Sequence, residues 1–366
     1  MPKHTKHGAI VKPAIGQYGR NEWAVIGAPC ELIEQWVGSV SNRLSPKWQC
    51  AFTDADHQTH STHVAAADAH QELKSVGDSD VYRLRSWLND YDALFINGNH
   101  FTARRQIVII DERKKDSLQR KLDRLTDVQL ILLQDDISEP WPFLTEHLQG
   151  NAVPILQLSD VAAAASWIDD ALTRAVPPLR GLVLAGGKSV RMGSDKGLME
   201  YHGKPQREFT ADLLAPHCTE VFISCRPDQT AEIEAPYRPL PDTFLDLGPY
   251  SALLSAFRAY PDSAWLVVAC DLPLLDEGTL QFLAQRRDPS RMATAFNSPD
   301  NEFPEPLIAI WEPKAYQILL QFLAQGYSCP RKVLINSNIA LLQAPCTRAL
   351  TNVNTPEESA EVRNQF

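Results

Sequence analysis

The chain has 366 residues, of which 44% are hydrophobic and 22% are charged, and its formal net charge at pH 7 is -10. This length exceeds what one hydrophobic core usually supports, so we expect two domains. An acidic chain is a poor candidate for nucleic-acid binding, which depends on neutralising backbone phosphates. No apolar run approaches the roughly eighteen residues of a membrane span, so we expect no membrane partner.

The cysteines and the N-terminus indicate a cytoplasmic protein. Seven cysteines are scattered along the chain without a Cys-x-x-Cys pair. This pattern predicts reduced thiols rather than disulfides or a zinc site. The first residues, from Met1 to His7, are basic but no apolar segment follows them, so we predict no secretory signal.

Residues 1–176 alternate apolar strands with helical patterns. Pro177 and Pro178 cannot continue the last helix, which places the domain boundary near residues 176–179. The second domain then covers residues 177–366. We predict strands at 23–27, 48–53, 93–97, 106–111, 128–134 and 153–158, and helices at 30–44, 112–125, 141–148 and 161–173.

Three histidines in the first domain stand three residues apart. His57, His60 and His63 form this group, and His70 follows. Such spacing places only neighbouring pairs on one helical face, and no carboxylate or cysteine completes a ligand set. We therefore favour a solvated polar segment over a metal site.

The second domain repeats the alternation of strands and helices. We predict an α/β fold for both domains, each with three layers and a mostly parallel sheet. The strands are expected at 179–184, 220–226, 264–271 and 306–311, and the helices at 250–260, 276–286 and 312–325.

A glycine-rich loop, Leu184-Ala-Gly-Gly-Lys-Ser-Val-Arg-Met-Gly-Ser-Asp-Lys196, follows the first strand of the second domain. Gly186 and Gly187 allow the backbone to approach a ligand closely, and the loop carries three cations. It lies where ligands of open α/β sheets bind. It matches neither Gly-x-x-x-x-Gly-Lys-Ser/Thr nor Gly-x-Gly-x-x-Gly. A bare Gly-Gly-Lys is usually an ordinary turn, but the longer pattern favours a phosphate site.

This loop and three later motifs together resemble the nucleotidyltransferases, and most of all the MobA-like molybdenum cofactor guanylyltransferases. The last motif discriminates best, because related cytidylyltransferases usually carry acidic residues where this chain has asparagines. The resemblance covers residues 179–366 and implies a Rossmann-like fold. The later motifs are Pro241-Asp242 with Gly248-Pro249, Ala269-Cys-Asp-Leu-Pro273, and Asn352-Val-Asn-Thr-Pro-Glu357.

The resemblance implies that the chain transfers GMP from GTP to molybdopterin and releases pyrophosphate, with Mg²⁺ as cofactor. Asp271 would hold the metal and act in catalysis with Arg191 and Lys196, which stabilise charge on the phosphates. Asn352 and Asn354 would bind the acceptor. The nucleotide-binding residues would be Leu184, Ala185, Gly186, Gly187, Lys196, Ser224, Asp242, Gly248 and Asp271.

Several of these positions have structural alternatives. Asp271 could instead cap the helix that follows Pro273, and Asp242 could form an Asx turn. Asn352 and Asn354 could cap the helix that begins near Pro356. These alternatives remain open from the sequence.

Two departures from the family pattern affect the nucleotide site. Ser224 stands where the family commonly has an asparagine, and Gly248-Pro-Tyr-Ser-Ala252 replaces Gly-Pro-Leu-Ala-Gly. Either change could alter base preference or lower affinity. Transfer from CTP, or to another phosphorylated acceptor, is therefore an alternative function.

The first domain faintly resembles the MobB-like GTP-binding adaptor. Asn97 takes the usual acidic place in Asp92-Ala-Leu-Phe-Ile-Asn-Gly-Asn-His100. The segment Gly27-Ala-Pro-Cys-Glu-Leu-Ile33 has no Gly-Lys-Ser/Thr, so we predict a degenerate domain that does not hydrolyse GTP. It would dock a partner or stabilise the enzyme. A second hypothesis is a delivery module, with little turnover, that brings the cofactor to apo-molybdoenzymes or their chaperones.

Overall fold

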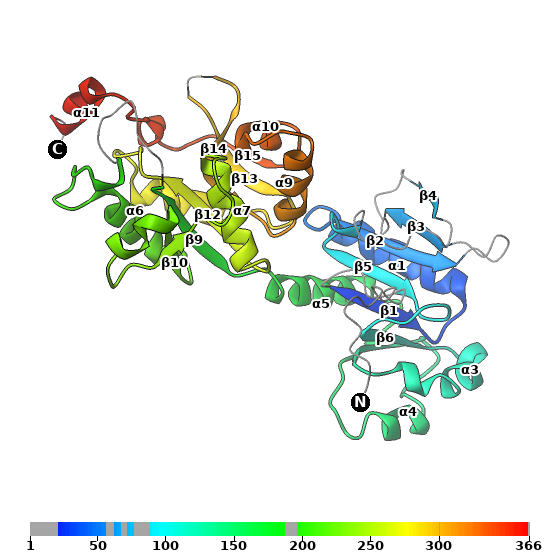
Figure 1. Cartoon of the computed structure of the whole chain (residues 1–366). Helices are drawn as coiled ribbons and strands as arrows, with labels where there is room; N and C mark the ends of the chain where they lie inside the picture. The colour runs from blue at the N-terminus through cyan, green and yellow to red at the C-terminus, as the bar shows by residue number, and fades with distance from the viewer. Residues whose placement is uncertain are drawn as a thin grey trace, which may run out of the picture. The chain divides into compact units, whose positions relative to one another are not determined.

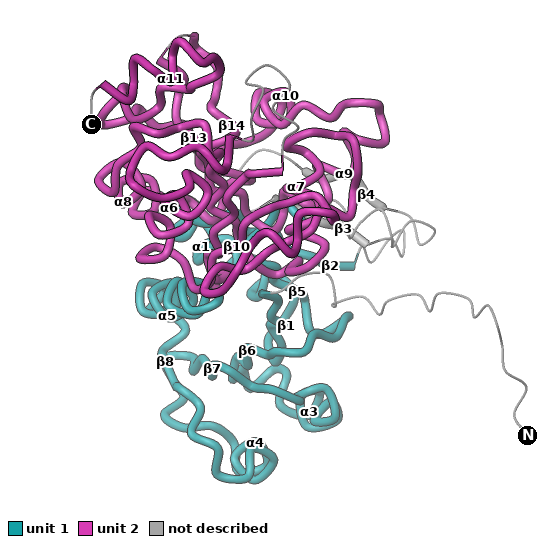
Figure 2. Tube along the Cα trace, turned by 60° about the vertical axis from the view of Figure 1, so that its left-hand side comes forward, with its two compact units in different colours: residues 1–175 teal, residues 176–366 magenta. Residues whose placement is uncertain are grey.

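The computed structural model describes residues 21–55, 88–186, 196–299 and 301–364, and the backbone of two further strands at 62–66 and 72–76. The chain divides into two compact units, residues 1–175 and 176–366 (Figure 2). Each unit has its own sheet and its own helices (Figure 1). In the part of the chain that is described, no helix is both long and apolar enough to span a membrane.

The described strands of the first unit form one sheet in the order β4-β3-β2-β5-β1-β6-β7-β8. Neighbours from β2 to β8 run parallel, whereas β3 and β4 add antiparallel strands at one edge. The bounds are β1 Glu22–Ile26, β2 Cys50–Ala55, β3 Thr62–Ala66, β4 Glu72–Val76, β5 Ala93–Asn97, β6 Arg105–Ile110, β7 Val128–Leu133 and β8 Ile155–Gln157.

The predicted histidine segment is described only in part. His63 lies in β3, which the sequence analysis did not predict. His57, His60 and His70 lie outside the described residues.

Helices cover both faces of the first sheet. Trp36 of α1 contacts Phe95 of β5 edge-on, with ring centroids 6.5 Å apart. On the other face, Ile26 of β1 belongs to one apolar cluster with Leu118 and Leu144. These layers are built from α1 Cys30–Leu44, α3 Lys115–Gln119, α4 Pro142–His147 and α5 Val161–Arg174.

The single helix predicted at 112–125 is wrong. The segment instead forms a 3-10 turn at Glu112–Lys114, the short helix α3 and a second 3-10 turn at Leu122–Arg124. Asp111 starts the first turn by accepting the backbone N–H of Arg113. Leu118 is the one buried side chain of α3, so packing supports only a short helix there.

The described strands of the second unit form one sheet in the order β11-β10-β9-β12-β14-β13-β15. The strands from β11 to β12 are parallel, which confirms a mostly parallel α/β sheet. However, β14 runs antiparallel to both of its neighbours. The bounds are β9 Leu179–Leu184, β10 Val221–Cys225, β11 Pro239–Pro241, β12 Ala264–Ala269, β13 Ala293–Asn297, β14 Pro304–Trp311 and β15 Ala340–Leu342.

Strand β12 lies between two apolar clusters, one on each face of the sheet, so the second unit has three layers. Trp265 and Val267 belong to the apolar cluster on one face, and Leu266 and Val268 to the cluster on the other. A strand buried on both faces is continuously apolar rather than alternating. The two clusters are completed by helices α6 Gln206–Leu214, α7 Pro249–Ala259, α8 Glu277–Gln285 and α9 Ala315–Ala324, and α10 Pro330–Ile335 and α11 Pro356–Arg363 follow.

Candidate active site

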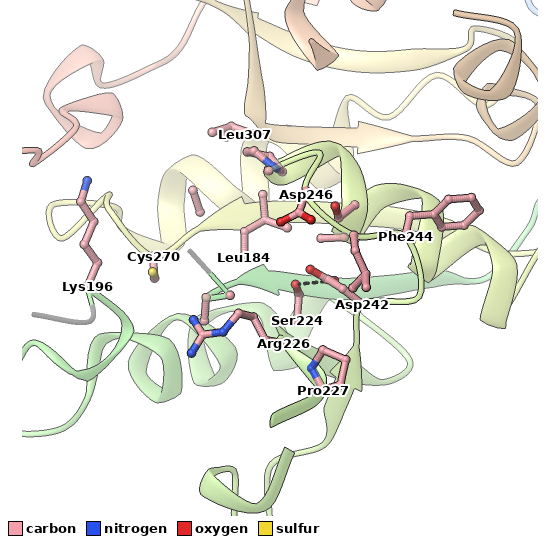
Figure 3. A pocket seen from close by; sticks show the side chains of 18 of the residues that line it. Leu184, Lys196, Ser224, Arg226, Pro227, Asp242, Phe244, Asp246, Cys270 and Leu307 are labelled. Carbon is pink, nitrogen blue, oxygen red and sulfur yellow. Dashed lines mark hydrogen bonds between the residues drawn. The ribbon is translucent and has the colours of Figure 1, made fainter. Parts of the chain in front are cut away.

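The candidate site lies at the carboxyl ends of three adjacent parallel strands of the second unit, β9, β10 and β12. A cavity of about 700 Å³ opens there (Figure 3). Ser224 and Asp242 lie together on one wall, and Lys196 lies apart from them. The predicted residues that line this cavity are Leu184, Ala185, Gly186, Lys196, Ser224, Asp242, Gly248 and Asp271.

Three predicted phosphate-binding residues of the glycine-rich loop fall outside the described residues. These are Gly187, Lys188 and Arg191. Their roles stay predictions. Lys196, the last cation of the loop, does lie within the described residues.

Asp271 follows β12 and has an uneven environment. Its Oδ2 lies 3.6 Å from Lys196 Nζ, and its side chain is 19% exposed. Its Oδ1 is buried and has no hydrogen-bond partner among the described residues. Burial raises the pKa of this carboxyl above its ordinary value, although Lys196 acts in the opposite direction.

The alternative in which Asp271 caps a helix is wrong. Helix α8 begins at Glu277, and Asp276 is its N-cap, accepting the N–H of Thr279 at 2.7 Å. The Asp271 carboxylate is therefore left facing the cavity rather than satisfying a helix end.

Lys196 also ties Asp271 to the asparagine motif. Its ammonium donates to Asn354 Oδ1 at 2.8 Å and to the carbonyl of Val353 at 2.9 Å. The N–H of Val353 in turn donates to the Asp271 carbonyl at 2.9 Å. Two segments more than eighty residues apart are thus held side by side.

The asparagines do not cap the last helix. Thr355 is the N-cap of α11 and accepts the N–H of Glu358, which completes a capping box. The structural alternative for Asn352 and Asn354 is therefore wrong. Both residues instead line a second cavity.

This second cavity has a volume of about 170 Å³ and shares Asp271 with the first. Glu305 and Arg331 also line it, joined by an ion pair of 2.9 Å. The sequence analysis missed both residues. A signal was present for Glu305, because it is a charged residue next to an apolar strand, but the predicted strand began only at residue 306.

Asp242 is the second perturbed carboxyl of the first cavity. Burial raises its pKa to about 6, and a hydrogen bond from Ser224 at 3.3 Å opposes this shift. The N–H groups of Thr243 and Phe244 both donate to Ser255 Oγ. They are not held by Asp242, so the Asx-turn alternative is wrong.

The altered segment after Gly248 keeps its bulky residue out of the cavity. Tyr250 is fully buried and donates to the carbonyl of Leu319 at 2.7 Å. Ser251 and Ala252 line the cavity instead. Gly248 has φ +59° and ψ -136°, a conformation that essentially requires glycine.

The chain matches a known family over its second unit, which contains the candidate site. The model of the MobA-like NTP transferase domain matches residues 181–340. A molybdenum cofactor guanylyltransferase of Pseudomonas putida is 32% identical over 191 residues, which cover 50% of this chain and 96% of that protein. The chain belongs to this guanylyltransferase family.

Two further similar proteins share different fractions of their length with this chain. A molybdenum cofactor biosynthesis bifunctional protein of Synechocystis is 36% identical over 186 residues, and this chain spans 54% of its length. A solved structure of molybdopterin-guanine dinucleotide biosynthesis protein A from Archaeoglobus fulgidus has 20% identity and a TM-score of 0.44, and covers 51% of this chain and 97% of that one.

Proposed function

We propose that the second unit transfers GMP from GTP to molybdopterin, releases pyrophosphate and forms molybdopterin guanine dinucleotide. The observation that carries this proposal is the pair of cavities that meet at Asp271. The larger one has the volume of a site for a small organic ligand. The names of the family members, molybdenum cofactor guanylyltransferase, support the same reaction.

The nucleotide would occupy the larger cavity. Its purine would lie along the backbone of Leu184 and Ala185, near Ser224 and Asp242. Its phosphates would approach Gly186 and the loop that follows. An added Cβ at Gly186 would lie 3.4 Å from the Cys225 backbone, an ordinary contact, so a ligand rather than the fold would require glycine there.

Asp271 would hold a magnesium ion. Its buried, unpartnered Oδ1 fits a cation ligand, because an isolated buried carboxylate oxygen is costly. Among the described residues no group of three or more Asp, Glu, His or Cys side chains is suited to a metal. Magnesium often binds through one or two carboxylates together with phosphate oxygens and water, and when bound it would offset the charge of the triphosphate.

The acceptor phosphate would lie in the smaller cavity. Arg331 offers a planar fork of donors for phosphate oxygens, and Asn352 and Asn354 add neutral polar groups. Lys196, between the cavities, would stabilise the charge that builds up as the acceptor phosphate attacks the α-phosphorus and pyrophosphate leaves. Most of the rate enhancement would come from positioning and electrostatics.

The reaction is tested with purified chain, molybdopterin and Mg²⁺, supplied in turn with each of the four nucleoside triphosphates. We expect a dinucleotide product and pyrophosphate with GTP. Ser224 replaces the asparagine that is common in the family, so the same assay tests whether the base preference differs from that of the family. Product with CTP and none with GTP would refute guanylyl transfer.

The delivery hypothesis is tested separately. The changed residues 250–252 and the absence of a phosphate-binding lysine near Gly27 support a carrier role, whereas the intact set of Arg191, Lys196 and Asp271 argues against it. An Asp271→Ala variant that fully retains cofactor maturation would support delivery over catalysis. We also propose that residues 1–176 form a degenerate MobB-like domain, and measurable GTP hydrolysis by this segment would contradict that.

A further inference from the structure

The first unit places three reactive side chains at the carboxyl edge of its sheet. Cys30 is the first residue of α1, just after β1. His100 follows β5, and Asp54 lies near the end of β2. Since β2, β5 and β1 are adjacent parallel strands, their carboxyl ends meet at one edge. Ligands of open α/β sheets bind at this edge.

These side chains are in contact. Cys30 Sγ lies 3.3 Å from His100 Nε2, and the same nitrogen lies 3.8 Å from Asp54 Oδ1. Asn97 is fully buried and donates its amide to Asp54 Oδ2 at 2.9 Å, which holds the carboxylate in place. The side chains of His100 and Asp54 are 25% and 21% exposed, so both are in contact with solvent.

The turn between β1 and α1 places Cys30 at this edge of the sheet, and the turn requires a glycine. Gly27 has φ +98°, and a Cβ at this residue would lie 2.3 Å from the Ile109 carbonyl oxygen. Pro29 is the N-cap of α1 and provides no side-chain hydrogen bond to its first turn. In this strand–turn–helix arrangement, a nucleophile at the start of the helix is exposed beside backbone N–H groups.

A helix N-terminus and a lysine lie near the thiol. Helix α1 has 15 residues, and its N-terminal dipole favours negative charge. Lys121 is close enough to interact electrostatically with Cys30, and its ammonium donates to the Asn99 carbonyl at 3.1 Å. Arg124 donates to the carbonyl of Gly98 at 3.3 Å. Cys30 is partly exposed, and a neighbouring cation and a helix N-terminus are features that reactive cysteines share.

We propose that Cys30 and His100 form a nucleophilic thiol site that takes a small acyl donor, either a thioester or an activated ester, and that the Asp54 carboxylate offsets the positive charge of the protonated imidazole. The thiol proton moves to His100 Nε2 as the S–C bond forms, and the carbonyl oxygen gains its negative charge beside the first turn of α1. The bond to the leaving group then breaks, and the leaving group takes the proton from His100. Water hydrolyses the acyl-cysteine, which yields a carboxylic acid and restores the thiol.

A metal site is not the better explanation of this cluster. Within the described ranges, no group of three or more His, Cys, Asp or Glu side chains has an arrangement that suits a metal ion. The thiol–imidazole contact, in contrast, has the hydrogen-bonded geometry that proton transfer from a nucleophile requires.

The test uses p-nitrophenyl acetate as probe with the full chain. Release of p-nitrophenolate measures acylation, and peptide mass spectrometry gives the acetylation rate of each cysteine. Cys329 and Cys346 are exposed and serve as internal references. We expect Cys30 to be acetylated at least ~10²-fold faster than either, which is the usual contribution of a positioned base.

Variants separate the base from simple exposure. His100→Gln is expected to slow acetylation of Cys30 by ~10²-fold, whereas the matched control Cys329→Ser leaves that rate unchanged. Asp54→Asn is expected to slow it as well, and Asp54→Glu to recover part of the rate. Circular dichroism checks that each variant is folded.

Three results would overturn the proposal. The first is equal acetylation of Cys30 and Cys329 in the unchanged chain, a comparison that needs no variant to fold. The second is an unaltered rate in folded His100→Gln. The third is a zinc ion that co-purifies with the chain and is lost in Cys30→Ser.

Discussion

Replacing Asp271 with asparagine separates catalysis from stability, because the two are expected to change in opposite directions. The ion pair with Lys196 at 3.6 Å has a Coulomb energy of about 4.6 kcal/mol at an effective dielectric constant of about 20. The desolvation of a buried carboxylate costs several kcal/mol, so the two terms are of the same size. The raised pKa of Asp271 indicates that burial outweighs the attraction.

The Asp271→Asn variant should therefore be as stable as the unchanged chain or slightly more stable. Asparagine keeps the shape and removes the buried charge, and Lys196 retains its bonds to Val353 and Asn354. Because the pKa is raised in the folded state, the folded unit holds this proton more tightly than the unfolded chain. The contribution of Asp271 to the stability is thus fully present below the ordinary pKa of 3.8 and is lost as the pH rises through the raised pKa. The variant lacks this loss.

Activity should change much more. Loss of a group that stabilises charge in the transition state typically reduces kcat by ~10²–10³-fold, so we expect a loss of this size for guanylyl transfer. Asp246→Asn is the matched control, because Asp246 also lines the cavity and asparagine tolerates its φ of +59°. Initial rates with GTP measure activity, and thermal unfolding followed by circular dichroism measures stability.

The reasoning fails if Asp271→Asn keeps full activity but unfolds at a lower temperature. A decrease of about 2–4 °C would correspond to about 1 kcal/mol in a unit of this size. Asp271 would then serve to anchor Lys196 rather than to take part in the reaction.

Three further changes test other parts of the second unit. If the ionised Asp242 binds GTP, KM for GTP should fall as the pH rises through about 6. Asp242→Asn should remove this pH dependence. A KM that does not change with pH in the unchanged chain would contradict a role of Asp242 in GTP binding. Gly248→Ala should lower the free energy of unfolding in urea by about 1–3 kcal/mol through backbone strain alone, since among the described residues no heavy atom beyond the two chain neighbours lies within 4 Å of the added methyl. An unchanged midpoint would exclude strain. Arg287→Met should lower the free energy of unfolding by about 3–5 kcal/mol, because Glu312, which is 1% exposed, loses its bidentate partner. Combining Arg287→Met with Glu312→Gln should recover much of this free energy.

Most elements of the fold could be predicted because their sequence signals are local. The apolar run of β12 reflects burial on both faces, and helix α1 has the predicted bounds, with its apolar face against the sheet. The direction of β14 could not be predicted, since an apolar strand pattern is the same in either direction. The segment 112–125 failed because helical periodicity does not report whether packing supports a continuous helix.

The sequence by itself determined the chemistry of the second unit. A glycine-rich loop, an aspartate after an apolar strand and an asparagine motif indicated a phosphate-handling enzyme before any contact was known. Only the tertiary structure excluded a helix-cap role for Asp271 and Asn354, because the helices that begin after Asp276 and Thr355 already have these residues as caps.

The tertiary structure alone also brought Arg331 into the same cavity as Asp271, and His100 beside Cys30. In the second unit the reason is the antiparallel pairing of β14 with β12, which brings the start of β14, with Glu305 and its partner Arg331, to the edge where β12 ends. In the first unit the reason is strand order. Parallel strands collect side chains from distant parts of the chain at one sheet edge, and strand order, which no local pattern encodes, decides which of them meet.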